Sequence, residues 1–193
     1  MSTSINEIKE RNARSYKLIL LFGMVSMFMM FAGLTSAFVV SKSRADWVKD
    51  FQLPSAFYFS TAAILCCSIT FHLAKKAIQK DKRSATTSFL LATFALGIVF
   101  VILQFAGFRQ IVDSGYFFTG SASSITTTFL YIVTIVHLAH LAGGLISLLI
   151  IIYNHFKQKY NSTQTLGIEL GAMYWHFLDF LWVYLFLFLY FFK

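Results

Sequence analysis

Charged side chains are scarce in this sequence. Asp, Glu, Lys and Arg make up 12% of the 193 residues, about half of the share that is usual in soluble domains. Hydrophobic residues make up 58%, and a soluble domain of this size cannot cover so much apolar surface with so few charges. The composition excludes a soluble enzyme and a disordered chain, and it favours a polytopic membrane protein folded as one bundle.

Cysteine and proline are nearly absent. The only two cysteines, Cys66 and Cys67, are adjacent within an apolar run, and neighbouring residues on a helix do not face each other, so we expect no disulfide between them. They form no CxxC motif, which excludes a disulfide scaffold and gives no signal about the redox compartment. The single proline, Pro54, suits the start of a helix because its missing N–H would be unpaired there.

Long apolar runs dominate the rest of the chain. They predict an all-α fold with five transmembrane helices at about residues 18–40, 55–74, 84–108, 126–153 and 171–192. The first run has 23 uncharged residues, enough to cross the ~30 Å hydrocarbon core, and a helix satisfies its own backbone in lipid. Residues 1–17 are expected to form a polar tail and residues 18–193 a single membrane domain. The connections leave no room for a separate catalytic domain.

Basic residues outnumber acidic ones by 16 to 8 and are unevenly distributed. Eleven lie in the tail and in the second and fourth connections, whereas five lie on the opposite side of the predicted bundle. The positive-inside rule then predicts a cytoplasmic amino end and a carboxyl end outside. No basic patch is interleaved with exposed aromatic residues, so we expect no nucleic-acid partner.

A few titratable side chains fall inside or beside the apolar runs, where a polar group is costly and needs a partner. His137 and His140 are three residues apart on the fourth run, and His176 and Asp179 on the fifth, so each pair shares a helix face. Glu169 lies just before the fifth run. Two interpretations are open: the side chains hold helices together by hydrogen bonds, or they bind a metal or haem, or relay protons.

A haem with two His ligands is the sharpest form of the second interpretation. His72 and His176 are both expected toward the cytoplasmic ends of their helices, so the chain would then be a small b-type cytochrome. A metal site needs three or four converging ligands, and the fourth run supplies only two His. A small transporter ranks last, because no inverted repeat with broken helices is visible. We expect His155 to meet water and Gln104 to lie at the outer interface.

Two segments carry a more specific pattern. Residues 174–182 read Tyr-Trp-His-Phe-Leu-Asp-Phe-Leu-Trp, which closely resembles the Tyr-Trp-His-Phe-x-Asp-x-x-Trp signature of subunit III of the haem-copper respiratory oxidases. The segment from Thr134 to Gly144, with His137 and His140, is similar to that family's Thr-Gly-x-His-x-x-His-x-x-Gly segment. The first two apolar runs resemble the family's first two common helices.

The sequence departs from the family pattern in three ways. Met27 follows Ser26, where many members have Glu, so this chain lacks that carboxylate. Ile135 replaces the usual Gly. The chain has five predicted helices and so resembles the shorter bacterial forms, which lack the first two helices of the longer members.

The resemblance implies an accessory subunit of a terminal oxidase in the bacterial plasma membrane. It implies packing against subunit I, beside subunit II and a small subunit IV, with bound phospholipid and support of proton uptake and turnover stability. It implies no redox centre in this chain: the haems and copper belong to partner subunits, which also receive electrons from cytochrome c or quinol. The complex as a whole reduces O₂ and translocates protons.

The resemblance and the burial argument together assign roles to particular residues. We expect a structural polar network formed by His137, His140, His176, Asp179 and Glu169. The candidates for contact with another subunit or with lipid are Ser26, Trp175, Phe177 and Trp182.

Overall fold

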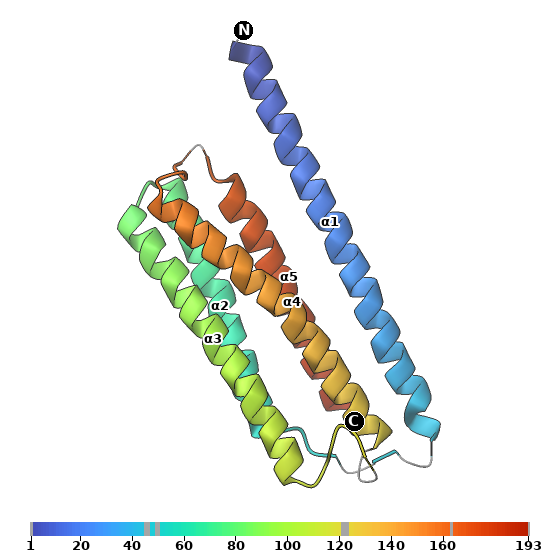
Figure 1. Ribbon diagram of the computed structural model, residues 1–193. Helices are drawn as coiled ribbons and strands as arrows, with labels where there is room; N and C mark the ends of the chain where they lie inside the picture. The colour runs from blue at the N-terminus through green and yellow to red at the C-terminus, as the bar shows by residue number, and fades with distance from the viewer. Residues whose placement is uncertain (1, 45–46, 49–50, 121–123, 163, 193) are drawn as a thin grey trace.

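The computed structural model describes residues 2–44, 47–48, 51–120, 124–162 and 164–192. These residues form five long helices and a short 3-10 turn, in the order α1 (Ser2–Val40), η1 (Ser41–Ser43), α2 (Ser55–Gln79), α3 (Arg83–Asp113), α4 (Ile125–Phe156) and α5 (Leu166–Phe192) (Figure 1). Each of the five is long and apolar enough to cross a membrane. The prediction of an all-α bundle with five membrane-spanning helices is confirmed.

All five helices extend beyond the predicted apolar runs. α1 begins at Ser2 rather than at residue 18, so the described part of the polar tail continues the helix. α5 begins at Leu166 rather than at residue 171, which places Glu169 in its first turn. Hydropathy marks only the part of a helix that lies in hydrocarbon, whereas backbone hydrogen bonding continues into the polar region on either side.

The helices are arranged around α5. α2 packs mainly on α3, α4 packs on α5 and α3, and α5 also contacts α1 and α2. Figure 1 shows α1 beside this group, with its amino-terminal half diverging from the other four helices. Between α1 and α2, α5 therefore has a strip of surface that no other described helix covers.

Aromatic side chains fill the centre of the bundle. The indole of Trp182 packs edge-to-face on Phe57 and Phe100, and its Nε1 donates a hydrogen bond to Thr61 Oγ1 at 3.0 Å. A Cβ added at Gly144 would meet Leu178 Cδ1 at 2.9 Å, so the absence of a side chain there lets α4 approach α5 closely. The core thus fixes one face of α5 against α2, α3 and α4.

Candidate functional site

His176 and Asp179 meet Ser68 where α5 packs on α2. The Nδ1 atom of His176 shares a hydrogen bond of 2.7 Å with Ser68 Oγ and lies 4.0 Å from Asp179 Oδ2. Asp179 is buried, and neither of its carboxyl oxygens has a hydrogen-bond partner among the described residues. Asp179 is therefore a polar group held inside the apolar bundle, about one helix turn from the partly exposed imidazole of His176.

A hollow on the surface connects this pair to the end of the bundle that carries Lys17 and Glu169. A cavity of about 270 Å³ is lined by charged and imidazole side chains from three helices: Lys17 of α1, His72 and Lys75 of α2, and Glu169 and His176 of α5. A second cavity of about 350 Å³ shares His72 and His176 with it and extends past Ser68, Ile69 and Leu73. We call the two cavities together the basic groove.

Glu169 holds the diverging part of α1 against α5. Its Oε2 accepts a bond of 2.7 Å from Lys17 Nζ, and its Oε1 accepts one of 2.7 Å from Thr165 Oγ1. Glu169 also lines the basic groove together with His176. These two of the five expected network residues thus share one cavity, although no hydrogen bond joins them directly in the part of the chain that the structure describes.

His137 and His140 lie elsewhere, on α4. His137 is completely buried, with its ring centroid 5.1 Å from that of Trp182 and 5.9 Å from that of Phe100. Among the described residues neither of its ring nitrogens has a hydrogen-bond partner. His140 donates through Nδ1 to the carbonyl of Val136 at 2.7 Å. The structure therefore brings His176, Asp179 and Glu169 near the basic groove and leaves the two His of α4 in an aromatic environment.

The geometry does not favour a haem between His72 and His176. Their rings lie side by side, with centroids 6.3 Å apart and a tilt of 51°, on helices that pack directly on each other. A porphyrin held by two His needs the helices that carry them to stand apart, and α2 and α5 pack directly on each other. Throughout the described ranges, no group of three or more His, Cys, Asp or Glu converges as a metal site would require. The residues present do not fit the alternative of a b-type cytochrome.

The four contact candidates divide into two kinds. Trp175 and Trp182 are completely buried inside the chain, which corrects their expected role in contacts with another subunit or lipid: they pack on α2, α3 and α4 instead. Ser26 is exposed on α1 and Phe177 is half-buried on α5, so for these two residues a contact role stays a prediction.

Two polar residues assigned to the surface by sequence are internal. His155 is buried, and its Nε2 hydrogen-bonds with Thr87 Oγ1 at 2.9 Å. Gln104 is completely buried and donates from Nε2 to Ser60 Oγ at 3.0 Å. Their partners lie on other helices, so position in the sequence could not reveal them. The pairing of Lys17 with Glu169, 152 residues apart, had no sequence signal either.

Comparison with known proteins decides the family. A family model described as cytochrome c oxidase subunit III matches residues 10–193. The chain belongs to the cytochrome c oxidase subunit III family. Cytochrome c oxidase subunit 3 of Spodoptera frugiperda is 32% identical over 144 residues, which are 72% of this chain and 89% of that protein.

Other relatives in the subunit III family are longer. Cytochrome c oxidase subunit 3 of Drosophila melanogaster is 31% identical over 144 residues, which are 72% of this chain and 50% of that protein. The corresponding protein of Pelomedusa subrufa is 30% identical over 147 residues, 74% of this chain and 51% of that protein. The chain thus spans about half the length of these relatives. The resemblance carried by residues 134–144 and 174–182 is confirmed at the level of the family.

Proposed function

We propose that this chain is the accessory subunit III of a haem-copper terminal oxidase and holds no redox centre itself. The observation that carries the proposal is the family match across residues 10–193. The haems and copper belong to the partner subunits, which take electrons from cytochrome c or quinol and reduce O₂. This chain contributes to proton uptake and to the stability of the complex during turnover.

The proposed partners are oxidase subunits I and II and a small subunit IV. The five candidate membrane spans of the described residues support a location in a membrane, and the proposed membrane is a bacterial plasma membrane. The end of the bundle with Lys17, Lys75 and Lys159 faces the cytoplasm in this proposal, since basic connections stay on that side. The amino end is then cytoplasmic and the carboxyl end outside.

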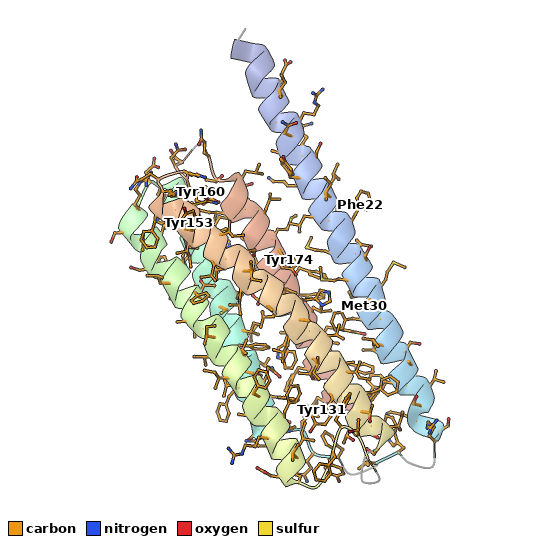
Figure 2. All side chains as sticks on the ribbon, viewed as in Figure 1. Phe22, Met30, Tyr131, Tyr153, Tyr160 and Tyr174 are labelled. Atoms are coloured by element: carbon orange, nitrogen blue, oxygen red, sulfur yellow. The ribbon has the colours of Figure 1, made fainter. Side chains whose placement is uncertain are left out.

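A phospholipid is a proposed ligand of the space between α1 and the pair α4–α5. A polar cavity of about 710 Å³, lined in part by Lys17 and Lys159, shares Tyr160 and Gly167 with an apolar cavity of about 380 Å³. Figure 2 shows Tyr160 near the α4–α5 connection and Tyr174 further along the bundle. A polar space at the membrane surface that continues into an apolar one matches a headgroup with its acyl chains. We call it the amphipathic cleft.

Affinity purification of the chain from its own membranes in a mild detergent tests the proposed function. We expect a large subunit that carries haem and copper to co-elute, and the visible absorption to leave with that subunit when this chain is separated from it. A haem absorption band that stays with the isolated 22.0 kDa chain would contradict the proposal and restore the cytochrome hypothesis.

A further inference from the structure

The basic groove leaves imidazole groups uncovered on the outside of the bundle. His72 is exposed on α2, and the side chain of His176 is 35% exposed on α5. Phe180 lies one turn further along α5 on the same face as His176. Phe180 is 62% exposed, and Ile69 on the α2 side of the groove is 61% exposed. Exposed apolar side chains thus lie beside the two imidazoles on both helices.

The depth of these imidazoles limits what can cover them. α5 has 27 residues and is about 40 Å long, so it extends about 5 Å beyond a ~30 Å hydrocarbon core on each side. His176 comes ten residues after Leu166, the first residue of α5, which places it about 10 Å inside the hydrocarbon. His72 comes seven residues before Gln79 at the end of α2, about 7 Å inside by the same arithmetic.

Lipid chains cannot hydrogen-bond with an imidazole at this depth, and polar side chains in membranes are found facing a protein interior or a water-filled space. Phosphate groups of lipids stay at the surface, outside the hydrocarbon, so they do not reach His176. A side chain on a transmembrane helix of another protein does reach it. The depth therefore favours a protein partner over a lipid headgroup.

The charge of the groove indicates which side chain the partner brings. Lys17, Lys75 and the two imidazoles are basic groups, and Glu169 is the one acidic side chain among the described residues that line the groove. Glu169 is already paired with Lys17. Asp179 lies behind His176, inside the bundle. An additional carboxyl group on the partner complements this arrangement, because a charge in hydrocarbon needs an opposite charge or a hydrogen bond.

We propose that the basic groove docks a transmembrane helix of the large oxidase subunit, and that a carboxyl side chain of this helix hydrogen-bonds with His72 and His176. The inference rests on the proposed function, because it names the surface that joins this chain to its partner. Ile69 and Phe180 then pack against apolar side chains of the same helix.

Site-specific photo-crosslinking in the intact complex tests this surface. Benzoylphenylalanine is placed at Ile69, which lines the groove, or at Phe180, one turn beyond His176 on the same face of α5. Ile102 of α3 and Ile146 of α4 are the control positions, with matched exposures of 61% and 60%. We expect adducts with the large subunit from Ile69 and Phe180 and none from the controls, and we expect the crosslinked segment to contain Asp or Glu. Adducts from the control positions alone, or adducts with lipid alone at Ile69 and Phe180, overturn the inference.

Removal of the imidazoles gives a second test. The double substitution of His72→Leu and His176→Leu should weaken retention of the large subunit about eightfold, the effect of two hydrogen bonds between membrane helices. His72→Gln with His176→Gln should restore most of the retention, and Ile102→Leu should leave it unchanged. Equal retention in the Leu and wild-type proteins contradicts the inference. Failure of the wild-type chain to retain any large subunit contradicts the proposed function itself.

Discussion

Asp179 is the buried acidic residue that most needs a partner in the described bundle. Its exposure is 3%, and its nearest basic group is the His176 imidazole at 4.0 Å. His176 in turn shares a hydrogen bond with Ser68 on α2. A carboxyl group in this place connects the packing of α5 on α2 to the imidazole that faces the basic groove.

Replacing Asp179 by Ala should loosen this region. The change removes the group that faces His176 and leaves a void, and loss of a buried polar partner costs about 1–3 kcal/mol. We expect the Asp179→Ala chain to bind subunit I more weakly, or the oxidase to lose activity sooner during turnover, with no change in haem content of this chain. Co-purification yield and the time course of O₂ consumption measure the two effects.

The conservative variant and an exposed acidic residue provide the controls for Asp179. Asp179→Asn keeps the volume and the hydrogen-bonding capacity of the side chain. Its co-purification yield and its time course of O₂ consumption should therefore be closer to those of the wild type than those of Asp179→Ala are. Asp113→Ala, at the exposed end of α3, should have no effect. An Asp179→Ala variant that assembles and turns over like the wild type would show that this carboxyl group does not stabilise the complex.

At the level of whole helices, α1 differs from the other four. It packs on α4 and α5 through residues such as Phe31 and Phe38, which are buried, whereas its amino-terminal half is separated from them by the amphipathic cleft (Figure 2). The ion pair of Lys17 and Glu169 closes one side of that cleft. This ion pair is partly exposed, and such pairs stabilise a structure by at most about 1 kcal/mol. Packing in the cleft therefore has to supply most of the free energy that holds the amino-terminal half of α1 against α4 and α5.

Filling the cleft should displace the proposed lipid. Ile150 lines the apolar cavity and is 56% exposed, so Ile150→Trp places an indole where an acyl chain would lie. We expect less phospholipid to co-purify with the variant, measured by native mass spectrometry of the purified complex. Ile102→Trp, on the outer surface of α3, serves as the control and should retain the wild-type amount. Equal lipid content in both variants would count against a lipid in this cleft.

The whole molecule has basic residues concentrated at one end. Lys75 and Lys159 lie at the same end of the bundle as Lys17 and Glu169, where they line the two cavities of that end. The opposite end contains the connection from α3 to α4. This asymmetry predicts the orientation of the whole chain in the membrane.

Cysteine labelling tests the orientation. In a chain with Cys66→Ala and Cys67→Ala, a new cysteine at Gln79 or at Ser114 marks one end of the bundle or the other, and both positions are exposed. We expect a membrane-impermeant maleimide to label Ser114→Cys in intact cells and Gln79→Cys only after the membrane is opened. The reverse pattern would show that the carboxyl end is inside.

Interactions between distant residues account for most of what the sequence did not predict. His155 was expected at water, and its partner Thr87 lies 68 residues away on α3. Trp175 and Trp182 were candidates for external contacts, and both fill the core. The segment of residues 174–182 was correctly recognised as a family pattern, but the pattern does not say which way each side chain points.

The sequence by itself determined the number of spans, the all-α class and the family, because long apolar runs and a specific motif are local properties of the chain. Only the tertiary structure decided which polar residues meet: Ser68 with His176, Lys17 with Glu169, and an aromatic shell around His137. The reason is physical. A helix that is hydrophobic all round gives no periodic signal for its rotation about its own axis, so the faces that pack together are set by contacts between helices.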